Sequence, residues 1–246
     1  MALTRGMPGA LTGGGRAPHY GVGARLSQRD CVDVCSRDVP ALAVTASSFC
    51  CVAVPYDERT ALLVIDVQND FAHPDGSLYV QGADEVIDVV NREVTSAAAA
   101  GALVVTTQDW HPPVTPHFAK DGGTWPVHCV RDTWGAALHD RLRPGRHAVF
   151  KGVGGEDGYS GFSMVHPTTG DRTPTGLDDL LRADGIERVV VAGLATDYCI
   201  KETVLDALRL GYDTTVVLDG IRPVELQPGD GQQAVDEMAG AGAALA

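Results

Sequence analysis

Three reactive residues stand where apolar runs of the sequence end, and together they could carry nucleophilic catalysis. Asp66 and Lys151 end the runs 61–66 and 147–151, and Cys199 follows the run 188–193. An acid at the end of a buried strand has a raised pKa and can accept a proton. A cysteine in the first turn of a helix is favoured as a thiolate by the helix dipole. The trio indicates a nucleophile, its base and a charge-balancing lysine.

Each of these residues also has a structural interpretation that the sequence leaves open. Cys199 could be a small buried hydrophobic residue, as most free cysteines are. Asp66 could form a turn or cap a helix, and Lys151 could extend its ammonium group to solvent. Cys129 lacks the helical context of Cys199, and we predict that it is structural.

A second group of side chains has the composition of a metal site. Asp109, His111, His117 and His128 lie within 20 residues of one another in a stretch that reads as a loop. Asp109 and His111 are two positions apart, so on an extended segment they point the same way. One carboxylate with several imidazoles suits one divalent ion, Zn²⁺, Fe²⁺ or Mn²⁺. The prolines 112–113 leave open that this segment is only a surface turn.

Aromatic residues in three separate loops could form the walls of a substrate pocket. Phe71, Trp125 and Tyr159 would together give a flat apolar cavity. The alternative is that they are packing anchors, which is common for aromatic residues in loops.

The elements that must position these residues alternate between two kinds. Short apolar runs predict strands at 61–66, 103–107, 147–151, 188–193 and 214–219, with a short edge strand at the end of the chain. Between or after them, helices are predicted over 82–100, 175–181, 197–210 and 232–239, with Thr196 as the N-cap of the third. Alternation of this kind is typical of βαβ units with a parallel sheet, whose ligand site lies beyond the carboxyl ends of the strands.

The long irregular stretch 109–146 and the glycine-rich loop after residue 151 follow two of these predicted strands. Loops as long as the first are usually functional inside a compact domain. The candidate acid, lysine, cysteine and metal ligands should therefore meet at one edge of the sheet.

Bulk composition restricts the class of protein and its partners. The 246 residues are 44% hydrophobic and 21% charged, which suits a globular protein with a substantial core. The net charge of −13 disfavours nucleic acid and anionic membrane surfaces as partners. No apolar run approaches the length of a membrane span. We expect a small-molecule substrate and a monomer or homo-oligomer.

Residues 1–54 differ from the rest of the chain. They contain four of the six cysteines, and seven of the first 25 residues are glycine. We predict a disordered extension, or a start site assigned too far upstream, followed by one domain over 55–246. Only two cysteines fall in that domain, which favours a reducing compartment such as the cytoplasm.

The motifs jointly resemble a known family. DVQNDF at 66–71, DWH at 109–111, WPVHC at 125–129, KG at 151–152, DGYSGF at 157–162 and GLATDYC at 193–199 occur in the order found in the nicotinamidase/pyrazinamidase branch of the isochorismatase-like cysteine hydrolases. The resemblance covers residues 58–246. It implies a three-layer αβα sandwich around a mostly parallel sheet.

The resemblance also implies a role for each candidate. Cys199 would attack the carboxamide of nicotinamide, and Asp66 would move the proton to departing ammonia. Lys151 would stabilise charge, and water would hydrolyse the thioester to nicotinic acid. The backbone N–H groups of Ala195 and Cys199 would form the oxyanion hole, behind a peptide bond before Ala195 that is typically cis in the family.

The implied metal site argues for a pyridine substrate. Asp109, His111 and His128, with His117, match ligands of an ion that would bind the pyridine nitrogen, and Phe71, Trp125 and Tyr159 match the pocket walls. Isochorismatases proper and the ureido-type amidases of the superfamily lack this cluster. The chain departs from the family in residues 1–54 and in His73, which could alter access to the pocket or add a ligand.

Two competing hypotheses remain at the level of sequence. The first is another amide or ureide hydrolase of the same superfamily, with a reduced metal site. The second is a binding or redox protein in which the metal is structural and Cys31, Cys35, Cys50 and Cys51 are the active thiols. Within the nicotinamidase hypothesis, pyrazinamide is a side substrate that the flat pocket would accept.

Overall fold

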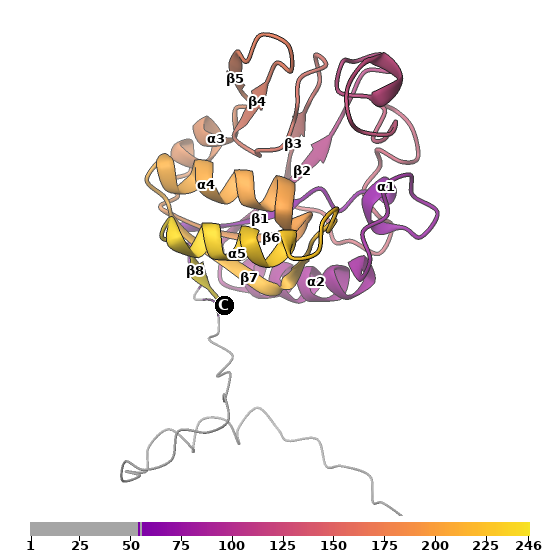
Figure 1. The fold of residues 1–246 in the computed structure, drawn as a ribbon. Coiled ribbons are helices and arrows are strands. Elements are labelled where there is room, and N and C mark those ends of the chain that lie inside the picture. Colours follow the sequence, from indigo (N-terminus) through magenta and orange to yellow (C-terminus); the bar gives the residue numbers. More distant parts are fainter. Residues whose placement is uncertain (1–53, 55) are drawn as a thin grey trace, which may run out of the picture. The chain divides into compact units, whose positions relative to one another are not determined.

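The computed structural model describes Val54 and residues 56–246, so the predicted extension 1–54 lies outside the described residues except for Val54 (Figure 1). This part of the chain contains both strands and helices. The strands are β1 (Thr60–Ile65), β2 (Leu103–Asp109), β3 (His147–Lys151), β4 (Ser163–Val165), β5 (Arg172–Pro174), β6 (Arg188–Leu194), β7 (Asp213–Arg222) and β8 (Ala244–Leu245). The α-helices are α1 (Asn69–Ala72), α2 (Ala83–Ala99), α3 (Leu177–Ala183), α4 (Lys201–Arg209) and α5 (Asp230–Gly240).

Six strands form one sheet in the order β3-β2-β1-β6-β7-β8, and every neighbouring pair in it is parallel. The predicted α/β sandwich and the short edge strand at the end of the chain are thereby confirmed. Starting from β1, the chain adds β2 and β3 on one side of the sheet and then β6, β7 and β8 on the other side. The direction in which strands are added therefore reverses between β1 and β6. A reversal of this kind opens a crevice beyond the strand ends.

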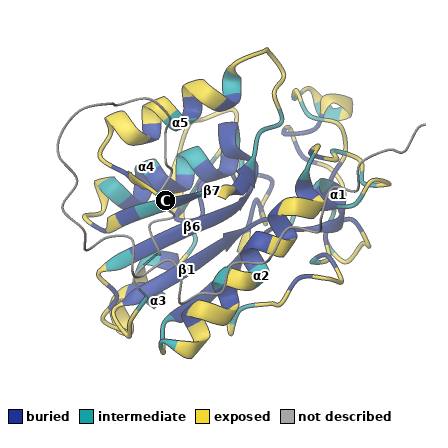
Figure 2. Cartoon of the chain, turned by 90° about the horizontal axis from the view of Figure 1, so that it is seen from below, coloured by how far each residue is buried: buried dark blue, intermediate teal, exposed yellow. Residues whose placement is uncertain are grey.

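Both faces of the sheet are covered, which explains why its central strands read as continuous apolar runs. Ala61, Leu63 and Ile65 of β1 belong to a core that includes residues of α3, α4 and α5. Leu62 and Val64 belong to the opposite core, with α2. Figure 2 shows the buried strands between α4 and α5 on one side and α2 on the other, with the exposed helix faces turned outward.

Helix α2 covers its face of the sheet with the valine stripe that the sequence predicts. Val86, Val89, Val90 and Val94 recur at helical spacing and are all buried. Gly101 follows the helix with a φ of 76° and ends it, because a residue with a β-carbon is strained in that conformation.

The entry to the cysteine helix differs from the prediction. Residues Thr196–Ile200 form a π-helical turn (η2) that precedes α4, and the N-cap is Ala195. The prediction of Thr196 as N-cap was wrong because the carbonyl of Ala195 accepts from both Tyr198 and Ile200, which places Thr196 inside the turn. The Thr196 hydroxyl is buried and has no hydrogen-bond partner among the described residues.

The helix α1, the strands β4 and β5 and the 3₁₀ turn η1 (Ala119–Asp121) were not predicted from the sequence. The four residues of α1 follow β1 directly, and β4 and β5 form an antiparallel hairpin outside the main sheet. All four are too short to produce a recognisable periodicity. Over the described residues, no helix combines the length and apolarity needed to cross a bilayer.

Candidate active site

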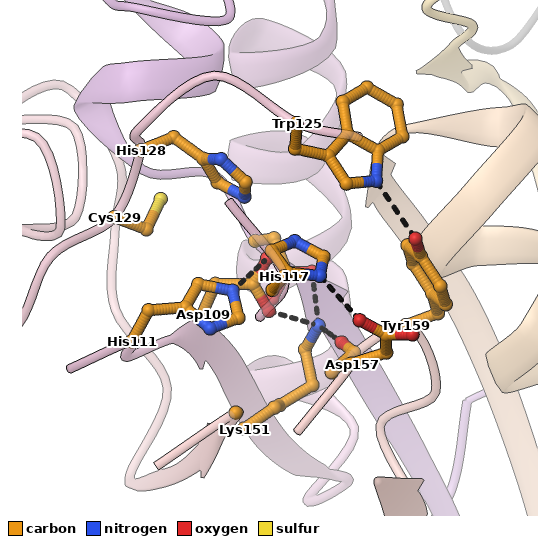
Figure 3. Close-up of polar contacts among 12 residues, drawn as sticks. Asp109, His111, His117, Trp125, His128, Cys129, Lys151, Asp157 and Tyr159 are labelled. Carbon is orange, nitrogen blue, oxygen red and sulfur yellow. Dashed lines mark hydrogen bonds and ion pairs between the residues drawn. The ribbon is translucent and has the colours of Figure 1, made fainter. Parts of the chain in front are cut away.

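The candidate catalytic residues lie together at or just beyond the carboxyl ends of four adjacent strands. Asp109 and Lys151 end β2 and β3 and are paired in the register of those strands. Asp66 follows β1, and Cys199 follows β6 through the π-helical turn. Because these strands are parallel neighbours, their carboxyl ends meet at the reversal of the sheet. Figure 3 shows Lys151 beneath the histidine cluster and Asp109 beside His111.

Lys151 lies at the centre of the site and is fully buried. Its Nζ is 2.7 Å from Asp66 Oδ2, 2.7 Å from Asp109 Oδ1 and 3.7 Å from Cys199 Sγ. It also donates to the carbonyl of Gly158. Burial alone would lower the pKa of Lys151, but the two carboxylates hold that pKa well above its ordinary value. The lysine is therefore a permanent cation between two acids and a thiol.

Asp66 is arranged as a proton acceptor. Its backbone has a φ of 49°, an uncommon conformation outside glycine that is found at functional sites. Thr107 donates to Oδ1 at 2.6 Å, whereas Oδ2 contacts Lys151 without hydrogen-bond geometry. A carboxylate oxygen of Asp66 lies within 4.8 Å of Cys199 Sγ. Burial raises the pKa of Asp66 to about 6 against the opposing charge of Lys151.

The two carboxylates differ in their titration. Burial also acts on Asp109, but Lys151 and the neighbouring imidazoles outweigh it and lower the pKa of Asp109 below its usual range. Asp109 is therefore the permanent anion, and Asp66 is the acid that can gain and lose a proton near neutral pH. When the surroundings of two acids shift their pKa values apart, the acid with the raised pKa is the candidate for acid–base catalysis.

Cys199 is buried in the turn η2, and burial raises the pKa of its thiol well above the ordinary value although Lys151 opposes this. Removal of the thiol from water therefore outweighs the stabilisation of a thiolate that the helix end offers. A protonated thiol needs a base, and Asp66 is the nearby carboxylate whose pKa is raised. The Leu194–Ala195 peptide bond before the turn is cis.

The three candidate histidines meet beside this trio. Nitrogen atoms of His111, His117 and His128 lie within 4.8 Å of one another, and all three residues are buried. Asp109 Oδ2 is 3.9 Å from His111 Nε2. Neither ring nitrogen of His111 has a hydrogen-bond partner among the described residues. Buried polar atoms without partners fit a metal ligand, so the donor set fits the predicted divalent ion.

The imidazoles of His111 and His128 are in the protonation state that metal binding requires. Burial lowers the pKa of His111 to about 3 and lowers that of His128 below its usual value. The Nδ1 of His128 lies 2.8 Å from the carbonyl of Pro126, so it donates there and leaves Nε2 as an acceptor. Neutral rings with one free nitrogen are ready ligands.

Gln68 and Asp70 support the segments that carry the candidate ligands Asp109 and His128, and sequence reasoning assigned neither residue a role. The amide of Gln68 accepts from the backbone N–H of Asp109 and donates to its carbonyl, both at 2.8 Å. Asp70 Oδ2 accepts from the N–H of Cys129 at 2.7 Å, directly after His128. The DVQNDF motif itself was the available signal, because buried polar residues follow an apolar strand there.

Gly152 lets the chain pass close to the metal loop. A β-carbon at this position would lie 2.5 Å from Cε1 of His111, and the backbone φ is 68°. No residue other than glycine fits this approach without displacing the ring.

The predicted pocket residues line one cavity together with Cys199. Trp125 Nε1 donates to the hydroxyl of Tyr159 at 2.8 Å, and Phe71 closes another side. Tyr198 packs edge-on to Trp125, with ring centroids 4.9 Å apart. The same cavity is lined by residues that sequence reasoning did not assign to it: Leu78, Leu194, Tyr198 and Val224.

Two other predicted positions lie outside the cavity. His73 packs against Trp134 and His139 and does not line the cavity, so its expected effect on access is not supported by a contact there. Cys129 is a buried free cysteine whose sulfur faces the carbonyl of Gly135 at 3.9 Å.

Sequence comparison finds matches over this same region. Residues 60–246 match the model of the Isochorismatase domain. The chain is 41% identical over 203 residues to a nicotinamidase of Escherichia coli, an alignment that covers 75% of this chain and 93% of that protein.

Solved structures with the same fold include two with bound molecules. The pyrazinamidase of Pyrococcus horikoshii in complex with zinc has a TM-score of 0.67 and 35% identity, over 76% of this chain and 98% of that one. The PnC1 protein of L. infantum in complex with nicotinate has a TM-score of 0.69 and 33% identity, over 78% and 95%.

Proposed function

Because the chain belongs to the isochorismatase family and is an amidohydrolase that acts on a carboxamide, we propose that it hydrolyses nicotinamide to nicotinic acid and ammonia. The observation that carries the proposal is one apolar cavity that is lined by members of both groups of residues. Cys199 lies on its wall with Asp109, and two histidines of the cluster, His117 and His128, lie there as well.

The reaction follows from the positions of the acid and the thiol. Asp66 takes the proton of the Cys199 thiol, and the sulfur attacks the carboxamide carbon. Asp66 then gives that proton to the amide nitrogen, the C–N bond breaks, and ammonia leaves behind a thioester on Cys199. Water attacks the thioester carbon with Asp66 as base, which releases nicotinic acid and restores the thiol.

Two features stabilise the charge that develops during these steps. The backbone N–H groups of Ala195 and Cys199 form the oxyanion hole for the carbonyl oxygen. Lys151 stays cationic throughout and stabilises the thiolate when the proton is on Asp66. Its contacts at 2.7 Å with Asp66 and 3.7 Å with Cys199 support this role.

The histidine cluster selects the heterocycle. Asp109, His111, His117 and His128 would hold one divalent ion, Zn²⁺, Fe²⁺ or Mn²⁺, which supplies a Lewis acid for the pyridine nitrogen. Phe71, Trp125 and Tyr159 exclude water and hold the planar ring in place, so that the carboxamide points at Cys199. Pyrazinamide has a ring nitrogen in the same position and is proposed as a side substrate.

A substrate panel separates this proposal from the ureide-hydrolase alternative. Purified full-length chain should release ammonia from nicotinamide and pyrazinamide, and at least about 10²-fold more slowly from benzamide, which lacks the ring nitrogen. Faster ammonia release from an N-carbamoyl amino acid than from nicotinamide would favour the alternative and reject the proposed substrate.

Removal of the metal should reduce activity without unfolding the chain. Dialysis against a strong chelator is expected to lower kcat/KM for nicotinamide by at least about 10²-fold, because the pyridine ring loses its anchor. Restoring Zn²⁺, Fe²⁺ or Mn²⁺ separately should recover the rate and identify the preferred ion. Full activity of a protein shown by elemental analysis to be metal-free would contradict the proposed role.

Activity should fall in acid with the titration of Asp66. The pKa of about 6 is raised by burial, and only the deprotonated form accepts the thiol proton. We expect kcat/KM to be constant above about pH 7 and to fall about tenfold per pH unit below about pH 6. Asp66→Asn should lose about 10³-fold in kcat and lose this acid limb. An unchanged limb in that variant would assign the titration to another group.

A further inference from the structure

Asp157 contacts the histidine cluster at His117, whereas Asp109 contacts it at His111. It belongs to the glycine-rich loop between β3 and β4, and its Oδ1 lies 2.5 Å from Nδ1 of His117 (Figure 3). The imidazole is buried, whereas the carboxylate is partly exposed, so Asp157 stands at the outer side of the cluster. The proposed mechanism gives this acid no role.

Backbone contacts position both members of this pair. Asp157 pairs in both directions with Val165 of β4, its N–H donating at 2.7 Å and its carbonyl accepting at 3.0 Å. On the other side, the hydroxyl of Thr115 donates to the carbonyl of Gly155 at 2.8 Å and accepts from the N–H of His117 at 3.2 Å. The hairpin thus fixes the acid, and Thr115 ties the histidine segment to the same loop.

The chemistry of the pair determines which nitrogen of His117 is free. An ionised carboxylate only accepts hydrogen bonds, so Nδ1 must carry the proton and Nε2 must carry the lone pair. The carbonyl of Pro126 acts in the same way on Nδ1 of His128. A partner that fixes the tautomer typically raises the metal affinity of a histidine ligand.

We propose that Asp157 is a positioning residue that fixes His117 in the tautomer whose Nε2 binds the divalent ion. The inference rests on the metal site of the proposed function. It makes His117 a direct ligand and gives the β4–β5 hairpin a function, since the hairpin sets the backbone of Asp157.

The test measures metal affinity rather than turnover. Zn²⁺ binding to the purified full-length chain is followed by competition with a chromophoric chelator. Asp157→Asn is expected to weaken Zn²⁺ binding by about 10- to 100-fold, because the asparagine amide can donate to Nδ1 and permit the other tautomer. Asp171→Asn is the matched control, since it removes the same charge from an exposed position of the hairpin turn. It should leave the affinity unchanged.

A double-mutant cycle asks whether Asp157 acts through His117. In a His117→Gln background, Asp157→Asn should add no further loss of Zn²⁺ affinity. Fully additive losses, or wild-type affinity in the single Asp157→Asn variant, would overturn the inference while leaving the metal site in place. A wild-type chain that binds no Zn²⁺ would reject the metal site of the proposed function and the inference together.

The tautomer can also be read without any change at Asp157. In ¹⁵N-histidine-labelled wild-type protein, with His117→Gln used for assignment, we expect His117 to be protonated on Nδ1 and to bind Zn²⁺ through Nε2. A His117 ring protonated on Nε2 in the metal-loaded protein would overturn the proposal, even if Asp157→Asn fails to fold.

Discussion

Replacement of Cys199 by alanine should reduce the hydrolysis of nicotinamide by at least about 10⁴-fold, because no other group in the site can form the thioester. The described part of the chain has two free cysteines, and only Cys199 lines the cavity with the metal-cluster residues. The substitution removes one sulfur atom from a buried position, so the fold should survive. Steady-state ammonia release and circular dichroism on the same sample measure both effects.

Cys129→Ala is the control for this experiment. Cys129 is as buried as Cys199, but its sulfur faces a backbone carbonyl and not the cavity. The control should lose about 1–2 kcal/mol of stability and keep most of its activity. If Cys199→Ala retained the wild-type rate, or if only Cys129→Ala lost it, the assignment of the nucleophile would be wrong.

Lys151→Met should be the most destabilising substitution in the site and should also remove activity. It leaves Asp66 and Asp109 buried without the cation that both contact at 2.7 Å. Breaking a buried ion pair by removing one partner typically destabilises a protein by about 3–5 kcal/mol. The free energy of unfolding in urea measures the loss. The rate should fall by at least about 10³-fold, because the thiolate loses its counter-charge.

A second substitution tests whether the unpaired carboxylates cause the loss of stability in Lys151→Met. In the double variant Lys151→Met/Asp66→Asn one of the two unpaired carboxylates is gone, so part of the lost stability should return while activity stays absent. Lys120→Met is the surface control, since Lys120 forms an exposed ion pair with Asp121, and solvent-screened pairs of this kind contribute little to stability. Equal stability of Lys151→Met and Lys120→Met would contradict the charge balance described for the site.

The sequence predicts the sheet and most of the site because both depend on local signals. The apolar runs that became β1, β2 and β6 are buried on both faces, and the edge strand β3 is buried on one face. The ends of β1, β2 and β3 carry Asp66, Asp109 and Lys151, and Cys199 follows β6. Parallel pairing then brings those ends together, so convergence follows from the strand prediction alone. The strand order that makes β1 the neighbour of β2 and β6 has no such local signal.

The contacts of the supporting residues could not be predicted, because their partners are distant in sequence. Asp157 meets His117 forty positions away, and Gln68 binds the backbone of Asp109 forty-one positions away. The state of the Cys199 thiol depends on total burial, which position in a helix does not reveal. Thr196 reads as an N-cap, but the π-helical turn that shifts the cap to Ala195 is set by tertiary packing.

The most direct test of the account is product analysis with the purified, metal-loaded full chain and nicotinamide as the only substrate. We predict nicotinic acid and ammonia in equal amounts, formed by the wild-type protein and not by Cys199→Ala. A folded, metal-loaded wild-type sample that forms neither product would contradict the proposed function.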